Sequence, residues 1–189
     1  MAVELGEIAA RGNFCTLDKK GNITDRRAGR ISTEEGQRLV KKLKEVSIPK
    51  AEFEIKHVKE YRFALILRGA VYGAEIDDTD PQQVGVPPLP AKARDRKSKA
   101  ASKLFDEWIA AAGDVLKEEE KANGLTLRGF STNPQLPPFK DIYGLSPACV
   151  AVYPMYRGVS KLVGMDVHEF AGDSPEDEFR AVTSIWDDH

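Results

Sequence analysis

The sequence changes character around the prolines between positions 134 and 138, and this change limits the possible folds more than any other feature. After them come an apolar run at 148–153 and a strand-like segment at 167–170, each followed by a helical pattern. Strand, helix, strand and helix joined by short connections are typical of parallel α/β crossovers. We therefore predict a βαβα segment of a parallel-sheet core over residues 132–189.

The region before the prolines predicts a different kind of domain. Residues 6–17 and 51–58 alternate apolar and polar side chains, and residues 62–68 form a more apolar run that suits the central strand of a hairpin. A helix begins after Ser32, which opens a capping-box sequence, and is predicted to reach about Val46. A second, longer helix with one apolar stripe is predicted from Ser98 to about Lys121. We predict an α+β domain over residues 1–131 with a mixed, mainly antiparallel sheet, so that the chain as a whole belongs to the α/β class.

Composition argues against several classes of partner. A net charge of −2 and a pI of about 6.0 leave no overall basic field to attract nucleic acid or an anionic membrane. No apolar run approaches the roughly 20 residues that span a bilayer, and the N-terminus lacks the basic and apolar regions of a signal peptide. We expect a cytoplasmic protein whose two distant cysteines, Cys15 and Cys149, are reduced and buried.

Anion binding is indicated by the run Asp25-Arg26-Arg27-Ala28-Gly29-Arg30. A guanidinium group donates in a rigid fork that matches two phosphate or carboxylate oxygens. The aspartate can brace one arginine, and the small residues let a ligand approach the backbone. A buried salt-bridge hub is the structural alternative, and the residues alone leave both interpretations open.

Three further arginines, Arg11, Arg68 and Arg128, each precede a glycine where a predicted strand ends. The simpler interpretation of each is a strand end that reaches solvent, followed by a turn. Their recurrence also favours a convergent anion pocket.

The residues alone supply no recognisable catalytic centre. Asp77, Asp78 and Asp80 carry oxygen ligands for a cation, but the calcium-loop spacing is missing and a flexible acidic loop is the simpler interpretation. The histidines have no metal-ligand spacing, and neither a Gly-rich phosphate loop nor a nucleophile-elbow serine occurs. No catalytic residue and no metal ligand is assigned.

Several ordered segments resemble one enzyme family. Residues 6–31 (GEIAARGNFCTLDKKGNITDRRAGRI), 61–69 (YRFALILRG), 76–81 (IDDTDP) and 123–165 (NGLTLRGFS through PPFKDIYGLSPACVAVYPMYRGVSKLVGM) are similar to successive parts of the archaeal-type, cofactor-independent phosphoglycerate mutases. This family belongs to the alkaline phosphatase superfamily. The order of the segments matches, and the likeness spans most of the chain.

The resemblance implies a glycolytic isomerase that interconverts 3-phosphoglycerate and 2-phosphoglycerate through a phosphoserine intermediate. In the family, two divalent metal ions (Mn, Mg or Zn) sit in a phosphatase-like α/β core, and an inserted α+β domain closes over the substrate. Residues 1–131 resemble that inserted domain, and residues 132–189 resemble the chain returning into the core. The resemblance implies the following substrate-binding residues: Arg11, Asn13, Asp25, Arg26, Arg27, Arg30, Arg68 and Arg128.

The family's metal ligands and nucleophilic serine lie outside the matching segments. We therefore expect this chain to be the substrate-binding portion of a metal-dependent mutase, inactive by itself. Its expected partners are phosphoglycerate and the remainder of the phosphatase-like core, without nucleic acid or membrane. The alternative is a non-catalytic module that binds phosphorylated metabolites.

Overall fold

The computed structural model describes residues 3–69 and 72–186. The chain forms two compact units, Met1–Asn133 (unit 1) and Pro134–His189 (unit 2). The division falls two residues after the boundary expected from the sequence. The two units differ in how much apolar surface each one buries.

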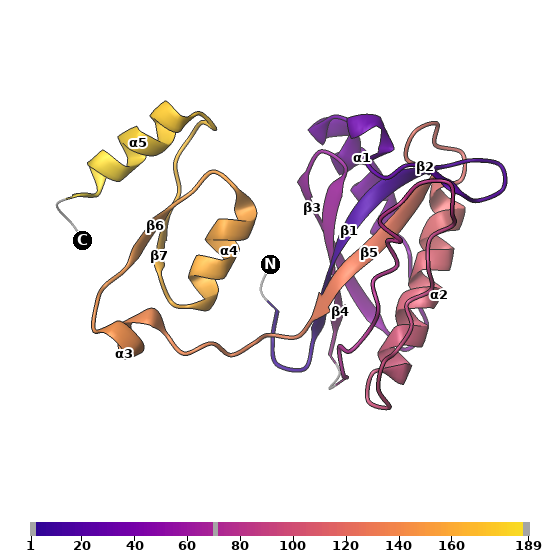
Figure 1. The fold of residues 1–189 in the computed structure, drawn as a ribbon, viewed down its shortest axis with the longest axis horizontal. Helices are drawn as coiled ribbons and strands as arrows, with labels where there is room; N and C mark the ends of the chain where they lie inside the picture. Colours follow the sequence, from indigo (N-terminus) through magenta and orange to yellow (C-terminus); the bar gives the residue numbers. More distant parts are fainter. Residues whose placement is uncertain (1–2, 70–71, 187–189) are drawn as a thin grey trace. The chain divides into compact units, whose positions relative to one another are not determined.

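Unit 1 contains a five-stranded antiparallel sheet and two long helices (Figure 1). The strand order is β2-β1-β4-β3, and β5 also pairs with β1. The predicted antiparallel sheet is thus confirmed, with the apolar run as its central strand β4. The elements are β1 (Ile8–Leu17), β2 (Ile23–Asp25), the 3₁₀ turn η1 (Ala28–Arg30), α1 (Thr33–Leu43), β3 (Glu52–Lys59), β4 (Arg62–Arg68), α2 (Lys99–Leu116) and β5 (Gly124–Ser131).

The core of unit 1 lies between one face of the sheet and the two helices. Alternate residues of a strand point to the same face, so Ile8 and Phe14 of β1 and Phe63 of β4 all enter the core. Trp108 of α2 meets them, with its ring centroid 6.4 Å from that of Phe63. The predicted apolar faces of both helices are confirmed, since they supply the fully buried side chains of Leu39, Leu43, Ala101, Phe105, Ala112 and Leu116.

The two helices begin where the sequence predicts but end earlier. Ser32 caps α1, because its hydroxyl oxygen accepts a hydrogen bond of 3.2 Å from the backbone N–H of Glu35. The sequence pattern predicts that α1 reaches about Val46, yet the helix stops at Leu43 because the chain turns to bury Ile48 and to form a bridge between Ile48 and Ala51.

The connection between β4 and α2 is packed rather than loose over residues 72–97. Ile76, Thr79, Asp80 and Ala91 within it are all buried. Thr79 pairs with the edge of β5, and residues 85–86 exchange backbone hydrogen bonds with Ile23 of β2. The connection therefore links β5 to β2, two strands that both pair with β1. The flexible acidic loop expected here is wrong for Asp80, whose residue is only 4% exposed.

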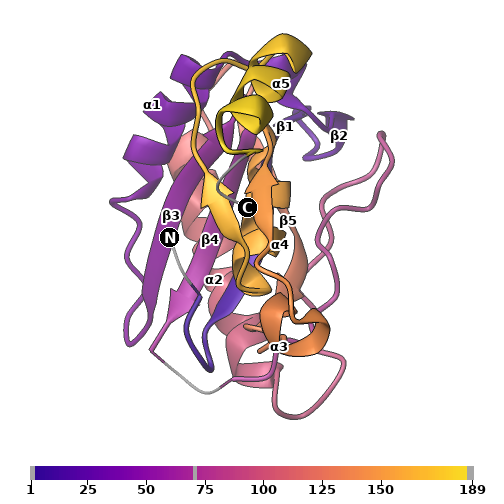
Figure 2. The same cartoon turned by 90° about the vertical axis from the view of Figure 1, so that its left-hand side faces the viewer.

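Unit 2 contains a two-stranded parallel sheet, which confirms the predicted crossover (Figure 2). It also has a short helix, α3, that the sequence patterns did not predict. Its elements are α3 (Phe139–Tyr143), β6 (Ala148–Val150), α4 (Pro154–Leu162), β7 (Asp166–His168) and α5 (Pro175–Ser184).

The helices of unit 2 bury none of their residues within the described part of the chain. Tyr156 and Val159 of α4 and Phe179 of α5 are each more than half exposed, although they lie on the apolar sides of amphipathic helices. None of the helices described, in either unit, has the length and apolar character needed to cross a bilayer.

Candidate anion-binding site

The arginine run follows β2 and is shaped by the carboxylate of Asp25. Its Oδ1 accepts a hydrogen bond of 2.7 Å from the backbone N–H of Arg27, and its Oδ2 accepts one of 2.8 Å from Gly29. The sequence suggested that Asp25 would brace a guanidinium group. In the structure it holds the backbone of η1 instead.

This backbone is left-handed over three consecutive residues, two of which are not glycine and are therefore strained. Ala28, Gly29 and Arg30 have φ angles of 49°, 63° and 51°. The left-handed region costs an ordinary residue about 1–2 kcal/mol, and strain of this kind clusters at functional sites. The two hydrogen bonds from Asp25 help to hold the strained turn.

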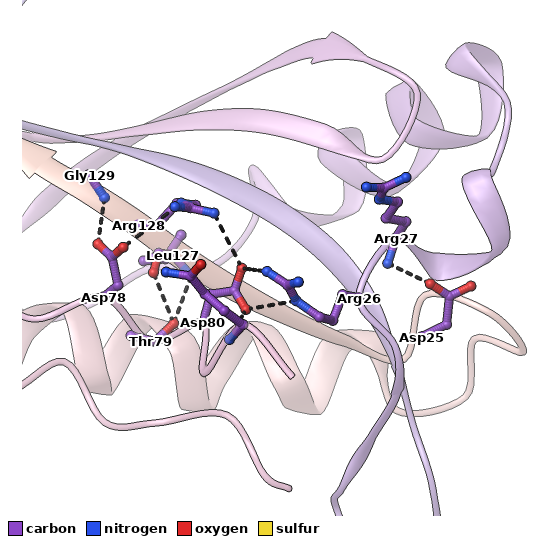
Figure 3. Close-up of polar contacts among 10 residues, drawn as sticks. Asp25, Arg26, Arg27, Asp78, Thr79, Asp80, Leu127, Arg128 and Gly129 are labelled. Carbon is purple, nitrogen blue, oxygen red and sulfur yellow. Dashed lines mark hydrogen bonds and ion pairs between the residues drawn. The ribbon is translucent and has the colours of Figure 1, made fainter. Parts of the chain in front are cut away.

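Arg26 points away from this turn and forms a two-point ion pair with Asp80 (Figure 3). Its Nε donates to Oδ1 at 3.1 Å and its Nη2 donates to Oδ2 at 2.8 Å. The Asp80 side chain is 2% exposed, whereas that of Arg26 is 34% exposed. A buried carboxylate therefore orients an arginine that still reaches solvent.

Arg128 of β5 approaches the same carboxylate. Its Nη1 lies 3.6 Å from Asp80 Oδ2, and its Nε lies 3.8 Å from Asp78 Oδ2. Asp78 Oδ1 also accepts a hydrogen bond of 2.7 Å from the backbone N–H of Gly129. We call Arg26, Asp78, Asp80 and Arg128 the arginine–aspartate cluster.

Thr79 fixes the cluster to the sheet. Its backbone N–H donates to the carbonyl of Leu127 at 2.8 Å. Its hydroxyl oxygen accepts a hydrogen bond of 2.7 Å from the N–H of Leu127. Because Thr79 is bound to Leu127 by these hydrogen bonds, its neighbours Asp78 and Asp80 are held next to β5 (Figure 3).

The electrostatics keep the cluster ionised. Burial by itself would raise the pKa of Asp80, but the hydrogen bonds from Arg26 and from the N–H of Gln82 and the charge of Arg128 together lower it below its ordinary value. The ion pair also raises the pKa of Arg26. Nearby Cys15 is buried, and that burial, with the charges of Asp80 and Asp25, raises the pKa of its thiol to about 12. Cys15 is therefore a protonated thiol at neutral pH.

Arg11 and Asn13 of β1 lie beside Arg128 on the sheet. Arg11 is directly opposite Arg128, and Asn13 is directly opposite Thr126 of β5. Arg11 is exposed, whereas Asn13 is buried. The Asn13 Oδ1 atom has no hydrogen-bond partner among the described residues, a condition that costs about 1–3 kcal/mol.

The remaining predicted arginines have different surroundings. Arg68, at the end of β4, forms ion pairs with Glu7 and Glu54, and the hydrogen bond with Glu54 contributes most to its raised pKa. The structure therefore gives it a role as an ion-pair hub. Arg27 and Arg30 are exposed and form no ion pair with any residue that the structure describes.

Sequence reasoning considered Asp80 only as a possible cation ligand and missed its pairing with Arg26, although Asp80 is the most buried charged group of the cluster. Its partner Arg26 lies 54 positions away, so no local pattern connects the two. The only available signal was the threonine between aspartates, since a β-former in an acidic run suits a segment that pairs with a sheet edge.

Comparison with known proteins identifies the family of the chain. The family model described as 2,3-bisphosphoglycerate-independent phosphoglycerate mutase matches residues 1–122, more than half of the chain. The chain belongs to this family. The resemblance noted in the sequence is confirmed.

Curated relatives carry the same description. Probable 2,3-bisphosphoglycerate-independent phosphoglycerate mutases are 45% identical over 186 residues in Thermus thermophilus and 40% identical over 192 residues in Aquifex aeolicus. These alignments cover 96% and 97% of this chain but only 46% and 47% of the relatives. The chain thus spans about half the length of the phosphoglycerate mutases that it matches.

A solved structure gives the same result for the fold. The cofactor-independent phosphoglycerate mutase from Thermoplasma acidophilum superposes with a TM-score of 0.70 at 25% identity. The match covers 100% of this chain and 55% of that protein.

The two divalent metals implied by the resemblance find no ligand set among the residues described here. No group of three or more His, Cys, Asp or Glu side chains lies close enough together, within residues 3–69 and 72–186, to hold a metal ion. The aspartates of the cluster are instead engaged by arginines and backbone N–H groups.

Proposed function

We propose that this chain is the substrate-binding portion of a phosphoglycerate mutase that interconverts 3-phosphoglycerate and 2-phosphoglycerate. The observation that carries the proposal is the arginine–aspartate cluster, in which Asp80 orients Arg26 and approaches Arg128. Membership of the mutase family supports the choice of substrate.

The cluster suits a small dianionic substrate. A guanidinium group has five N–H donors, and Arg26 uses two of them on Asp80. The other donors of Arg26 remain for a phosphate or carboxylate oxygen, while the aspartate prevents the side chain from rotating. Because this orientation is set before the ligand arrives, less side-chain entropy is lost on binding.

The other predicted residues complete the site in this proposal. Arg11 and Arg128 present two cations side by side, and Arg27 and Arg30 supply further guanidinium groups from the strained turn. Asn13 offers an amide whose Oδ1 is still unpaired among the described residues. We do not include Arg68 among the residues that contact the substrate, because it is held by Glu7 and Glu54.

Chemistry in the complete enzyme requires groups that we assign to the rest of the mutase. The metals and the nucleophilic serine implied by the family belong there, and the chain's own residues bind and orient the substrate. We further propose that the exposed apolar sides of α4 and α5 pack against the remainder of the phosphatase-like core, since amphipathic helices are stable when that side is covered.

Replacing Arg26 in a full-length mutase that contains this sequence tests the proposal. Arg26→Ala is expected to lower kcat/KM about 100-fold or more, since charge-assisted contacts to a reacting anion contribute about 2.7–4 kcal/mol. Arg94→Ala is the matched control, because Arg94 is 60% exposed and its ion-pair partners among the described residues, Glu75 and Asp77, are exposed as well. Unchanged turnover in the Arg26 variant would refute the assignment.

A second function is favoured by one observation. Unit 1 holds its cluster together with its own residues and a closed core, so it needs nothing else to present an anion site. A stand-alone module that binds phosphorylated metabolites is the resulting alternative. It differs from the first proposal in the affinity expected for this chain alone.

A further inference from the structure

A second basic surface of unit 1 lies in a groove between α1 and β3, with a volume of about 610 Å³. This size is within the range of ligand-binding clefts. The residues that line it are Thr33, Gln37, Lys41, Lys44, Lys56 and His57, together with Val40 and Val58.

One wall of the groove is a stripe along α1. Gln37, Lys41 and Lys44 are spaced by four and three residues, so they follow one another along the same side of the helix. Val40, which is 4% exposed, forms part of the base. The helix thus presents polar and basic side chains above an apolar floor.

The other wall is an edge strand. β3 is the last strand in the order β2-β1-β4-β3, and no strand of the described chain pairs with its outer edge. An unpaired edge leaves a row of backbone N–H and C=O groups that can pair with an extended polypeptide. Lys56 stands on this strand beside the groove.

The groove is rigidly built at one end. Gly36 packs so closely on the β3–β4 turn that an added Cβ would lie 2.1 Å from the carbonyl oxygen of Glu60. The His57 Nε2 atom lies 2.8 Å from the same oxygen, and Thr33 Oγ1 accepts a hydrogen bond of 3.2 Å from the Glu60 N–H. The distance between helix and strand is therefore fixed before any partner arrives.

The groove carries uncompensated positive charge. Lys41, Lys44 and Lys56 form no ion pair with any residue in the described ranges, and no carboxylate lines the groove. The whole chain has a net charge of −2, so this concentration of cations is local.

We propose that the groove binds an extended, acidic segment of polypeptide, which adds to β3 as a further strand. The edge backbone would supply the pairing, and Lys41 and Lys44 would select carboxylate side chains on the alternate residues that face α1. Lys56 lies next to His57 on β3, so its side chain stands on the opposite face of the strand and adds positive charge that attracts an acidic segment. Pairing of two copies of this edge is disfavoured, because the lysines of both copies would face each other. An acidic partner removes that repulsion.

The test is a titration of the ¹⁵N-labelled 189-residue chain with a seven-residue peptide that alternates Glu with Val or Thr. We expect saturable binding with shifts in 33–44 and 52–59, and new protection of outward-facing amides of β3. The double variant Lys41→Glu/Lys44→Glu should weaken binding about tenfold or more, as for loss and reversal of charges at an interface. The matched control Lys99→Glu/Lys103→Glu on α2 should stay within about twofold.

Three results would overturn the proposal. The first is absence of saturation at about 1 mM peptide, because strand pairing along β3 together with charge complementarity should bind the peptide more tightly than that. The second is equal weakening by both double variants, which would reduce the effect to net charge. The third is inorganic triphosphate, rather than the peptide, producing the shifts, which would make the groove a site for small anions.

Discussion

Unit 1 and unit 2 belong to one chain but bury their apolar residues very differently. In unit 1 the cluster of buried side chains runs through both helices and at least three strands. In unit 2 Ala151 is the one buried apolar residue among those described, while Trp186 is 74% exposed. Both units have regular helices and paired strands, so they do not differ in secondary structure. They differ because unit 1, among the described residues, encloses a core of buried apolar side chains and unit 2 does not.

The difference suggests how work is divided between the units. A closed core lets unit 1 hold the arginine–aspartate cluster in place without help. Unit 2 has the strand and helix pattern of an α/β core but lacks partners on its apolar sides among the described residues. The comparison predicts that stability, as well as ligand binding, resides in unit 1 when the chain is studied alone.

Hydrogen exchange of the 189-residue chain gives the largest expected contrast. Amides in the middle of β1 and β4 should exchange at least about a thousandfold more slowly than those of β6 and β7, because core strands open only with global unfolding. The measurement is exchange followed by NMR or mass spectrometry. Similar protection in both units would break the comparison.

A pair of matched phenylalanine truncations tests the same contrast in energy. Phe63→Ala should destabilise the chain by about 3–5 kcal/mol, since the ring is fully buried against Phe14 and Trp108. Phe179→Ala in α5 should change stability by less than about 0.5 kcal/mol, since that residue is 71% exposed. Urea denaturation followed by circular dichroism measures both, and comparable losses would mean that unit 2 has a core of its own.

The variant Asp80→Asn tests whether the arginine–aspartate cluster contributes to the stability of unit 1. We expect a loss of about 2 kcal/mol at pH 7, because the buried hydrogen bonds to Arg26 lose their charge. Asp77→Asn, at a side chain 49% exposed and paired with Arg94, is the control and should cost less than about 1 kcal/mol. Urea denaturation again measures both, and equal losses would remove the cluster from the account of stability.

The same variant has a pH signature. The pKa of Asp80 is lowered on folding, so the unfolded state binds the proton more tightly. The stabilisation by Asp80 is complete above its unfolded pKa of about 4 and is lost as the pH falls through the lower folded value. The difference in stability between wild type and Asp80→Asn should therefore shrink below about pH 4. A constant difference across that range would contradict the role given to this carboxylate.

The sequence predicted the elements better than the contacts. The alternating segments 6–17 and 51–58 and the capping serine at 32 are local signals, and the structure confirms the strands and the helix start that they predict. α3 is only five residues long and follows prolines, so it offers no periodicity to detect. Its end at Gly144, with φ of 67°, is a turn signal rather than a helix signal.

The candidate site was predictable in its residue types but not in its pairings. The sequence alone indicated that the guanidinium groups of the arginine run could bind an anion. The ion pair between Arg26 and Asp80 could not be predicted, because it depends on how the connection between β4 and α2 folds along β5 and β2. Arg68 had the same Arg-Gly signature as Arg11 and Arg128, yet it pairs with glutamates from β3 and from the segment before β1. Whether such an arginine forms an ion pair or remains available to a ligand depends on the strand register and on the acidic residues nearby, and a short motif contains neither kind of information.

Titration of this chain with 3-phosphoglycerate, followed through the arginine Nε resonances, tests the central claim most directly. We predict shifts at Arg26 and Arg128 with a dissociation constant of about 1 mM or weaker, as for a site that supplies only part of the contacts. Glycerate, which lacks the phosphate, should shift them less. Micromolar affinity would instead favour the stand-alone binding module, and unchanged Arg26 and Arg128 resonances at saturating ligand would contradict the site itself.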